Sequence, residues 1–523
     1  MAVEDGAALA AMLSEVEHRN EVHNALKTFE KVRILRSGQM QKASLANGKL
    51  WHYADGPNQE ARDAAMQPEV LGKQVLESPN HWSDPLTQAW CYGYDAEADT
   101  ESRTRASKAR LHLPVELLKK MDIPGCAGVF SYFAGSAYHV LGQSSLNSAN
   151  FLNVTVRQPY GVVGMITPWN VPLIMFAFKA APALICGNTI VLKSSEKAPL
   201  SSLKLASLIK ESGFPPGVVN VISGSGLPTG AAMALHMKIR KISFTGSVAT
   251  GRKIMKMAAD SNLKNISLEL GGKSPALVLE DANIPAAVRY THFSIKYNSG
   301  QHCQANSRIL VQESIAQEFV VQLQALMSKV SLGDPSEEHT FQGLSTGLVD
   351  QIRLAHIQKL VDAGKADGVL LSGGDRNGTK GAYMEPTILM NVPMSSVAYK
   401  EEIFGPVVIV NTFKNEAEAL EEANGMEFGL FSSVFTKDLE KAVRVAKALD
   451  SGAVGVNCAV PLRALDMPIG GWKQSGIGKE LSLHGLDSYT ELKTIFIKYG
   501  EDATALANNW DSGGPYGVSS FAQ

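Results

Sequence analysis

One cysteine of this chain stands in a setting that suits a nucleophile. Cys303 lies in "NSGQHCQANSRILV" (298–311), among small and polar residues and shortly before an aliphatic stretch. A reactive thiol needs partial exposure and room for a substrate, and Gly300 and Ala305 leave that room. An isolated cysteine is also a common buried small side chain. The stretch alone therefore leaves both interpretations open.

Two residues are candidates for the base that such a cysteine chemistry needs. His302 is adjacent to the thiol, but neighbouring side chains generally point apart, which disfavours a direct pair. Glu269 ends the apolar stretch in "SLELGGKSP" (267–275), where partial desolvation would raise its pKa toward the range of a general base. The alternative for Glu269 is a carboxylate paired with a nearby lysine.

A third candidate closes "ITPWN" (166–170), a segment that leaves an expected strand. The amide of Asn170 can donate a hydrogen bond to a developing oxyanion, or it can simply cap the following helix. "VLKSSEK" (191–197) ends another expected strand with Lys193 and Glu196, which either hold a ribose or form a solvated charged turn.

Glycine-rich turns follow two further strands. In "SFTGSVATG" (243–251), Gly246 and Gly251 mark a strand-to-helix turn whose backbone N–H groups can hold a phosphate. The pattern is not the GxGxxG fingerprint of ordinary dinucleotide sites. The glycines of "ISGSGLPTG" (222–230) are either a close-approach loop or a turn, and we favour the turn.

The elements around these motifs are typical of an α/β fold. From about residue 155, short β-branched runs alternate with amphipathic stretches, which predicts parallel sheets covered by helices in two α/β blocks. Expected strands are 161–167, 188–193, 218–223, 241–246, 266–270, 274–280, 307–312, 405–413, 432–436 and 453–457. Expected helices are 198–213, closed by Gly213, 247–261, 314–330, 347–368 and 438–452.

Composition excludes several other classes. The chain has 523 residues, a formal net charge of -2 and 45% hydrophobic residues, so we expect two or three domains and no nucleic-acid partner. Its five cysteines never form a CxxC pair, which argues against a disulfide framework or a metal site. The N-terminus lacks a signal-peptide core, and prolines and Lys179 interrupt the most apolar region, 161–193. We therefore expect a cytoplasmic protein without a membrane segment.

Taken together and in this order, the motifs resemble the aldehyde dehydrogenase superfamily. The resemblance runs from "VFSYFAG" (129–135) to "YTELKTIFIKYG" (489–500). It includes "GFPPGVVNVISG", "ISFTGS", "LELGGKSP", "GQHCQANSR", "EEIFGPVV" (401–408), "GLFSSVFT" (429–436) and "PIGGWKQSGIGKE" (468–480).

The resemblance implies roles for individual residues. Cys303 would be the nucleophile, Glu269 the base that activates water, Asn170 an oxyanion donor together with the N–H of Cys303, and Lys179 a buried support of the proton path. His302 becomes a wall of the substrate tunnel. Residues implied at the cofactor are Ile166, Thr167, Pro168, Trp169, Lys193, Glu196, Gly226, Gly230, Phe244, Gly246, Ser247, Leu270, Gly271, Glu402 and Phe404.

The implied reaction oxidises an aldehyde to its carboxylic acid with NAD, through a thiohemiacetal and a thioester on the cysteine that Glu-activated water hydrolyses. Glu196 favours NAD because a carboxylate repels the 2′-phosphate of NADP, although NADP stays possible. The matching tunnel positions have fewer aromatic residues than many relatives, which predicts a medium or bulky uncharged aldehyde. These positions are Val171, Met175, Phe178, His302 and Leu462.

The resemblance also implies the architecture: two doubly wound Rossmann-like parallel-sheet domains and a small β extension for oligomerisation. The cofactor-binding domain would comprise 1–140 and 161–270, and the catalytic domain 271–470. Strands within 141–160 and 487–500 would form a homodimer or homotetramer, and 501–523 a loose tail. About the first 120 residues are atypical for the family. Two alternatives stay open: a catalytically impaired binding protein with this fold, and a cysteine-dependent esterase.

Overall fold

The computed structural model describes residues 57, 60, 121–148, 150–333, 347–379, 381–460 and 464–499. The chain divides into two compact units, Met1–Leu113 and Pro114–Gln523, and every element named below belongs to the second. The predictions for most of the first 120 residues, for the tail at 501–523 and for Leu462 lie outside the described residues.

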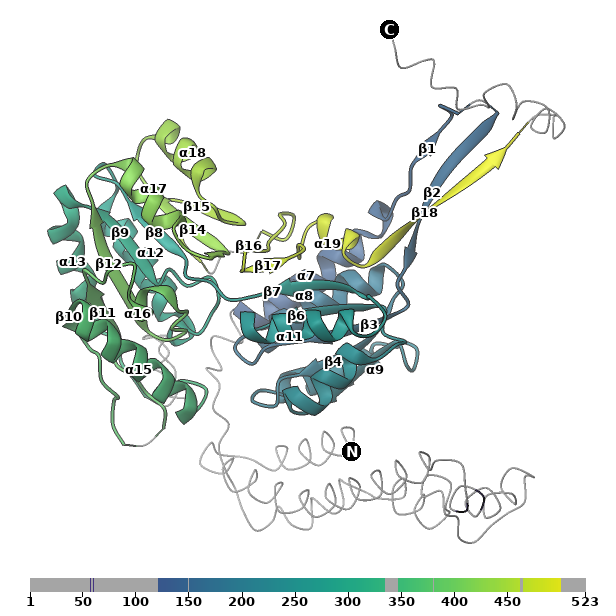
Figure 1. The fold of residues 1–523 in the computed structure, drawn as a ribbon, viewed down its shortest axis with the longest axis horizontal. Coiled ribbons are helices and arrows are strands. Elements are labelled where there is room, and N and C mark those ends of the chain that lie inside the picture. The colour runs from purple at the N-terminus through teal and green to yellow at the C-terminus, as the bar shows by residue number, and fades with distance from the viewer. Residues whose placement is uncertain are drawn as a thin grey trace. The chain divides into compact units, whose positions relative to one another are not determined.

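The first sheet is parallel except at one edge (Figure 1), with the strand order β17-β7-β6-β3-β4-β5. Its parallel strands are β3 (Val162–Ile166), β4 (Thr189–Ser194), β5 (Val219–Ser223), β6 (Lys241–Thr245) and β7 (Asn265–Glu269). A short strand, β17 (Gly476–Ile477), joins β7 antiparallel. The strands expected in this part of the chain are confirmed.

Helices cover both faces of the first sheet, as its doubly wound order requires. On one face, α7 (Ile123–Gly135), α8 (Pro172–Ile185) and α9 (Leu200–Glu211) share an apolar core with β3 and β4. On the other, α10 (Ala231–Leu235) and α11 (Val248–Ala259) pack on β6 and β7. Gly213, with a φ of +84°, follows the end of α9, as expected from sequence. The glycine-rich stretch Gly226–Gly230 forms one helical turn before α10.

The second sheet has the order β10-β11-β12-β9-β8-β14-β15, with only β10 antiparallel. Its strands are β8 (Pro275–Val278), β9 (Arg308–Gln312), β10 (Val369–Ser372), β11 (Thr387–Met390), β12 (Val407–Phe413), β14 (Phe431–Phe435) and β15 (Ala453–Val456). Its helices are α12 (Ile284–Lys296), α13 (Glu313–Met327), α15 (Gln351–Asp367), α16 (Val397–Lys400), α17 (Glu416–Asn424) and α18 (Leu439–Ala448).

Sequence analysis found the strongly patterned elements of this sheet and missed others. Helices α12 and α17 and strands β10 and β11 were not anticipated. A readable signal for α12 was present, because Asn283 caps the N–H of Ala286 and a proline occupies the first turn. The fold class, α/β with two mostly parallel sheets, is confirmed, and two small antiparallel sheets accompany them.

The extension is a three-stranded antiparallel sheet of β1 (Ser144–Ser145), β2 (Phe151–Pro159) and β18 (Thr490–Lys498). In Figure 1 the blue β2 and the yellow β18 run side by side, and all nine residues of β18 pair with β2, from Thr490 opposite Pro159 to Lys498 opposite Phe151. The expected pairing of these two distant segments is confirmed. Short helix α19 (His484–Asp487) precedes β18.

One buried side chain fastens this extension to the first sheet. Asn188, at the start of β4, donates from Nδ2 to the carbonyls of Ala183 and Tyr489, at 3.1 and 2.9 Å, and accepts from the N–H of Gly161. Because Tyr489 immediately precedes β18, the three bonds tie helix α8, strand β4 and the last strand together. Buried backbone groups that lose such a partner carry the full cost of desolvation.

We predict that Asn188→Ala lowers the free energy of unfolding by roughly 2 kcal/mol, because two buried carbonyls and the N–H of Gly161 each lose a hydrogen bond. Urea titration followed by circular dichroism measures the change. Asn220→Ala is the matched control: Asn220 also donates to two carbonyls, but it is exposed, and water can replace it. Equal losses in the two variants would contradict this role of Asn188.

Candidate active site

The candidate site lies where the strand order of the first sheet reverses. From β3 the chain proceeds to β4 and β5 on one side, whereas β6 and β7 lie on the other. Loops that leave the carboxyl ends of strands on either side of such a point form a crevice. The segments predicted to hold the cofactor follow β3, β4, β6 and β7, so the sheet brings their starting points to one edge.

The loops after β3 and β4 contact each other through Thr167 and Lys193. The N–H and the hydroxyl of Thr167 both donate to the carbonyl of Lys193, at 3.1 and 3.3 Å, and Ile166 is the residue paired with Lys193 across the strands. Lys193 Nζ is buried, donates to the carbonyl of Ser194 and lies 3.5 Å from Glu196 Oε2. The Glu196 side chain is 49% exposed, so its carboxylate is accessible to a ligand.

The turn after β6 leads into the 12-residue helix α11. Ser247 caps α11 by accepting from the N–H of Thr250, and the ring of Phe244 packs against Gly246, where a Cβ would come within 2.5 Å of it. Gly226 has open space where a side chain would stand, and Gly230 faces Ile166. Of these glycines, Gly230 lies at the end of β3, where a Cβ would be 3.8 Å from Ile166.

An aromatic pair joins the two halves of the site. Trp169, after β3, and Phe404, before β12, make an edge-to-face contact with ring centroids 5.5 Å apart. Arg353 of α15 lies on Phe404 at 5.2 Å from the ring centroid, and it donates to the carbonyls of Ile403 and Phe404. Phe404 has a φ of +56°, a left-handed conformation that these contacts hold in place.

The two glycines after β7 lie between the candidate cysteine and a carboxylate. A Cβ on Gly271 would come within 2.2 Å of Glu402 Oε2, and one on Gly272 within 2.3 Å of the carbonyl oxygen of Cys303. The N–H of Gly272 donates to Glu402 Oε1 at 2.8 Å. Only glycine permits both approaches, so this pair of residues brings Cys303, Glu402 and the end of β7 into one place.

The loop before Cys303 is held in a strained shape. Asn298, Ser299 and Gly300 have φ values of +50°, +53° and +70°, three left-handed residues in a row. Asn298 Nδ2 donates to the carbonyl of Asn170 at 3.0 Å, and Asn170 Nδ2 donates to the carbonyl of Gln301 at 2.9 Å. These reciprocal bonds place the Asn170 amide two residues from the cysteine, and one of its N–H groups is already occupied.

His302 does not face the thiol. Its Nε2 lies 2.7 Å from the carbonyl of Ser294, and its ring makes an edge contact with Tyr297. Burial lowers the pKa of His302 to about 4, so the ring stays neutral near pH 7 and Nε2 must be its N–H donor. This arrangement agrees with the sequence argument against His302 as the base for Cys303.

Burial dominates the electrostatics of the site. It raises the pKa of Cys303 to about 12, and the nearby carboxylates of Glu402 and Glu269 add to the effect. Burial likewise raises the pKa of Glu402 to about 7 and that of Glu269 well above its usual range, the latter with a contribution from Glu480. The carboxylates of Glu402 and Glu269 therefore oppose ionisation of Cys303, and all three groups are poorly solvated.

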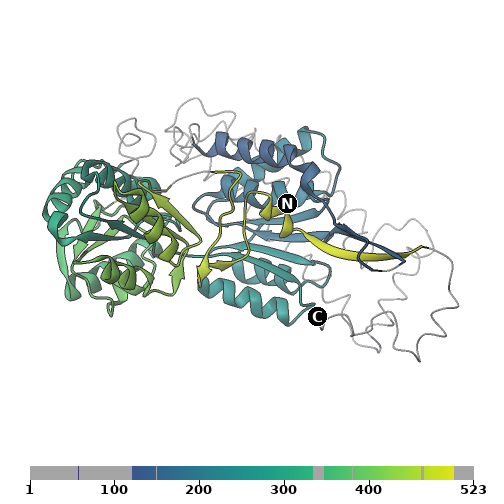
Figure 2. The same ribbon diagram turned by 90° about the horizontal axis from the view of Figure 1, so that it is seen from above.

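Lys179 supplies a positive charge below this space. It is fully buried on α8, and its Nζ lies 2.5 Å from Glu480 Oε1 and 3.0 Å from Ser243 Oγ. Glu480 belongs to "PIGGWKQSGIGKE", the segment that also carries β16 (Trp472–Lys473) and β17 and crosses between the sheets in Figure 2. In the same segment, the Ser475 hydroxyl donates to the carbonyl of Gly271 and accepts from the N–H of Gly429.

Sequence analysis quoted the segments that contain Glu480, Ser475, Asn298 and Arg353 but assigned these residues no role. The available signal was weak: a carboxylate, a serine and an amide inside matching motifs, and an arginine in an expected helix. Their partners are Lys179, Gly271, Asn170 and Phe404, which lie far away in sequence. Only the folded contacts identify such residues.

The predicted tunnel positions are on and beside α8. Val171 precedes that helix, and Met175 and Phe178 follow at helical spacing, so the three share a side of it. Phe178 is buried in the core that α7 and α8 share, and Val171 and Met175 pack partly buried against it. Their role in a substrate tunnel stays a prediction.

A doubly wound sheet with polar side chains gathered at its switch point, beside a half-buried cysteine, is the architecture of a dinucleotide-linked oxidoreductase with a thiol nucleophile. Comparison with known proteins identifies the family within this class. The sequence profile of the aldehyde dehydrogenase family matches residues 109–495. The chain belongs to the aldehyde dehydrogenase family and is an oxidoreductase, an NAD(P)-dependent aldehyde dehydrogenase.

Similar proteins, compared by sequence and by structure, are also aldehyde dehydrogenases. An aldehyde dehydrogenase of Emericella nidulans is 44% identical over 385 residues, covering 73% of this chain and 77% of its own. Aldehyde dehydrogenase 1A1 of Mus musculus is 45% identical over 381 residues, covering 73% and 75%. The NAD+ complex of a Bacillus cereus aldehyde dehydrogenase superposes with a TM-score of 0.72 at 39% identity, covering 74% of this chain and 78% of that one.

We predict that iodoacetamide alkylates Cys303 slowly in the cofactor-free protein and that the rate rises about tenfold per pH unit from about pH 7 to 10.5, past the pH at which an ordinary thiol levels off. The reason is the raised pKa, which keeps the thiol protonated and leaves little thiolate below pH 9. Mass spectrometry of the Cys303 peptide measures the rate, with N-acetylcysteine as the unperturbed control. A plateau for Cys303 at or below the pH of that control would contradict the burial effect.

Proposed function

We propose that this enzyme oxidises a medium or bulky uncharged aldehyde to its carboxylic acid by a hydrolytic route through Cys303. The observation that carries the proposal is the Gly271–Gly272 junction, which brings Cys303, Glu402 and the end of β7, where Glu269 stands, into contact. A thiol, a proton acceptor and a carboxylate that suits a ribose are the groups that this reaction needs at one point.

The described residues fit NAD as the cofactor. The N-terminus of the 12-residue helix α11, with Ser247 as its cap, suits the pyrophosphate, and the accessible Glu196 carboxylate beside Lys193 suits the adenosine ribose. Glu402 would hold the nicotinamide ribose, with Phe404 and Trp169 beside the ring. When bound there, NAD would supply the acceptor for the hydride that leaves the carbon bonded to Cys303. Glu196 favours NAD because its charge opposes a 2′-phosphate, with NADP as a slower alternative.

The protein's own groups carry the remaining steps. The Cys303 thiolate adds to the aldehyde carbon, and the Asn170 amide and the N–H of Cys303 donate to the oxygen that takes over its negative charge. After oxidation the acyl group is a thioester on Sγ. Glu269 takes a proton from water, the water oxygen bonds the acyl carbon, and the C–S bond breaks to release the acid. The raised pKa of Glu269 makes it a stronger base than an exposed carboxylate.

The tunnel lining supports the substrate class. Val171, Met175 and Phe178 are apolar, so a charged substrate beside them would lose its solvation without a partner, whereas an uncharged one avoids that cost. Leu462 would complete this lining. The domain division proposed is a cofactor-binding part, 1–140 and 161–270, and a catalytic part, 271–470. A reducing cytoplasm would keep Cys303 and Cys458 as free thiols.

We predict NADH formation at 340 nm with hexanal and benzaldehyde, a kcat/KM for hexanal above that for acetaldehyde, and faster turnover with NAD than with NADP. Cys303→Ala should lower the rate by at least about a thousandfold, because the thioester can no longer form. Cys458→Ala is the control and should keep wild-type activity. A steep preference for acetaldehyde would contradict the proposed tunnel.

The same assays separate the alternatives. Folded protein that binds NAD without oxidising any aldehyde would favour a binding role. Cleavage of 4-nitrophenyl acetate through Cys303, without aldehyde oxidation, would favour a cysteine esterase.

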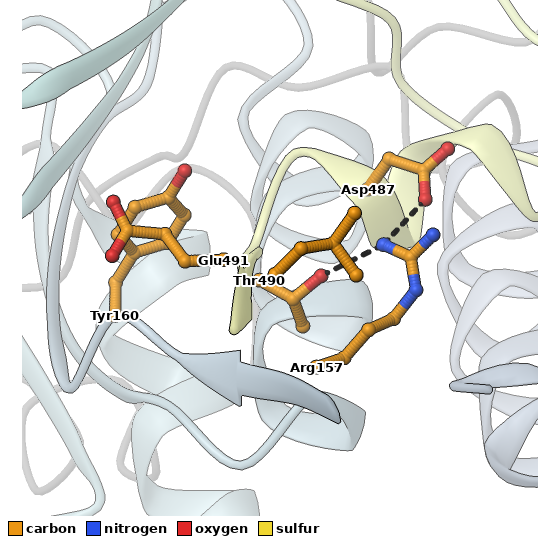
Figure 3. A pocket seen from close by; sticks show the side chains of 6 residues that line it. Arg157, Tyr160, Asp487, Thr490 and Glu491 are labelled. Carbon is orange, nitrogen blue, oxygen red and sulfur yellow. Dashed lines mark hydrogen bonds and ion pairs between the residues drawn. The ribbon is translucent and has the colours of Figure 1, made fainter. Parts of the chain in front are cut away.

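The extension supports assembly into a homodimer or homotetramer. Strand β18 is at the edge of its sheet and exposes a run of apolar side chains. Phe496 is 68% exposed and Leu492 61%, and long apolar edge strands associate unless they are covered. An open hollow of about 600 Å³ lies at the base of β2 and β18 (Figure 3), lined by Arg157, Tyr160, Asp487, Thr490, Glu491 and Leu492. None of the predicted catalytic residues lines this hollow.

We predict that Phe496→Asp shifts the protein to a smaller species in size-exclusion chromatography with light scattering, because a charge cannot be buried without a partner. Leu439→Asp is the control, since Leu439 is a similarly exposed apolar residue on α18. A wild-type monomer would contradict assembly through this strand, and so would an unchanged mass of Phe496→Asp.

A further inference from the structure

Two neighbouring strands of the first sheet carry polar residues where apolar ones are expected. On β6 these are Lys241, Ser243 and Thr245, and on β7 they are Asn265, Ser267 and Glu269. The strands are parallel and in register, with Lys241 opposite Asn265, Ser243 opposite Ser267 and Thr245 opposite Glu269. Side chains two apart share a face, so all six lie on one face of the sheet. We call this set the polar stripe.

The stripe faces helix α8, since Lys179 of that helix donates to Ser243. The residues between the stripe positions, Ile242, Phe244 and Leu268, lie in the apolar core on the opposite face. Parallel strands covered on both sides are ordinarily apolar on both faces, because buried polar groups are costly unless bonded. Six polar positions in register therefore require an explanation.

Hydrogen bonds connect the far end of the stripe to the surface. Lys241 is 1% exposed, and its Nζ lies 2.9 Å from Asn265 Oδ1 and donates to Ser267 Oγ. Asn265 is exposed at the start of β7. The ring of Tyr489 lies 5.9 Å from Lys241 Nζ, and a hydrogen bond to Ser243 lowers the pKa of the Tyr489 hydroxyl against the larger effect of burial. Lys241 thus contacts solvent-facing Asn265 on one side and a ring bonded to Ser243 on the other.

The near end of the stripe reaches the candidate base. Ser243 accepts from Lys179, whose other partner is Glu480 Oε1. Glu480 raises the pKa of Glu269, and a Cβ on Gly470 would come within 2.8 Å of Glu269 Oε1, next to Ile469, which pairs with Glu480. Among the described residues, Glu480 Oε2 and Thr245 Oγ1 are buried without a hydrogen-bond partner. Both are positions where a bound water would complete the chain of contacts.

We propose that Lys241 is the outer station of a proton path that runs along the polar stripe and carries the proton taken up by Glu269 to solvent at Asn265. The inference rests on the proposed role of Glu269 as the base for thioester hydrolysis. For each acyl group released, the water oxygen bonds the acyl carbon, its proton passes to the Glu269 carboxylate, and one proton must leave before the next turnover. The proton passes along the hydrogen bonds of Glu480 with Lys179, of Lys179 with Ser243 and of Ser267 with Lys241. Bound water would connect Glu269 to Glu480, and Ser243 to its register partner Ser267.

The charges that face Lys241 suit this role. Burial lowers the pKa of Lys241 to about 7, and the positive charge of Lys179 lowers it by more than the charge of Glu480 raises it. An ordinary lysine holds its proton at neutral pH, whereas this one can give it up and regain it. Lys241 touches neither substrate nor cofactor, so it is a positioning residue for the proton and not a catalytic residue.

The test compares the full-length wild type with Lys241→Met, which keeps the aliphatic stem and removes the amine. With hexanal and NAD, stopped-flow absorbance should show an unchanged single-turnover rate of NADH formation and a steady-state rate reduced by about tenfold. Added imidazole, a small proton acceptor, should restore part of the steady-state rate. Lys241→Arg keeps the charge but cannot release its proton, so it should be as slow as Lys241→Met.

One control and two further variants accompany this comparison. Lys256→Met alters an exposed lysine of α11 that pairs with Asp260 and should behave as wild type. Ser267→Ala removes the hydroxyl bonded to Lys241 and should slow steady state in the same selective way, which tests the path even where Lys241→Met does not fold. Glu269→Gln should slow steady state more than either variant.

An unchanged steady-state rate in Lys241→Met while Glu269→Gln is slow would overturn the path alone. Equal losses in both kinetic phases without any response to imidazole would also overturn it, because they would indicate a structural role. A Glu269→Gln enzyme with the wild-type rate would instead overturn the proposed base, and the path with it. Full activity of Lys241→Arg would show that only the charge matters and would overturn proton transfer through this residue.

Discussion

The ion pair between Lys179 and Glu480 is the contact on which the candidate site depends. Both side chains are buried, and removing either partner would leave an uncompensated charge in a poorly solvated space. Lys179 comes from α8 and Glu480 from the segment that also forms β16 and β17. The pair therefore fixes the position of that segment under β7. Through it, the surroundings of Glu269 are determined by residues from both ends of the described chain.

Around this pair lie three acidic groups, a thiol and two carboxyls, whose surroundings favour the protonated form. Nearby lysine and arginine side chains reduce the rise in the pKa of the two carboxyls. Burial raises the pKa values of Cys303, Glu402 and Glu269, and nearby carboxylates add to the effect at Cys303 and at Glu269. The glycines at 271 and 272 make this crowding possible, since any side chain there would separate Glu402 from Cys303. The Cys303 thiolate is disfavoured in this setting until a substrate and a positively charged cofactor bind and change its surroundings.

Sequence alone was sufficient for the parts of the fold that depend on local pattern. The β-branched runs of β3, β4 and β6 and the helical spacing of α11 are readable because period and burial coincide there. Resemblance placed Cys303 and Glu269 in matching motifs. Arg353 on Phe404, Asn298 on Asn170 and Glu480 on Lys179 were not readable, because each joins elements that meet only after both sheets have formed. The polar stripe was visible as alternation in "KISFT" and "NISLE", but its meaning required the register of β6 and β7 and the position of α8.

Pairing between distant segments has a consequence for how the protein matures. Lys179 and Glu480 are 301 residues apart, and the last described strand, β18, completes a sheet begun by β2. At roughly 5–20 residues per second, a ribosome needs on the order of 15–60 s to supply the second partner of each contact after the first has emerged. During that interval the nascent chain holds an unpaired lysine and an open sheet edge. The nascent chain is therefore inactive until Glu480 and β18 have been synthesised. Until then its open sheet edge can bind chaperones or pair with a wrong partner.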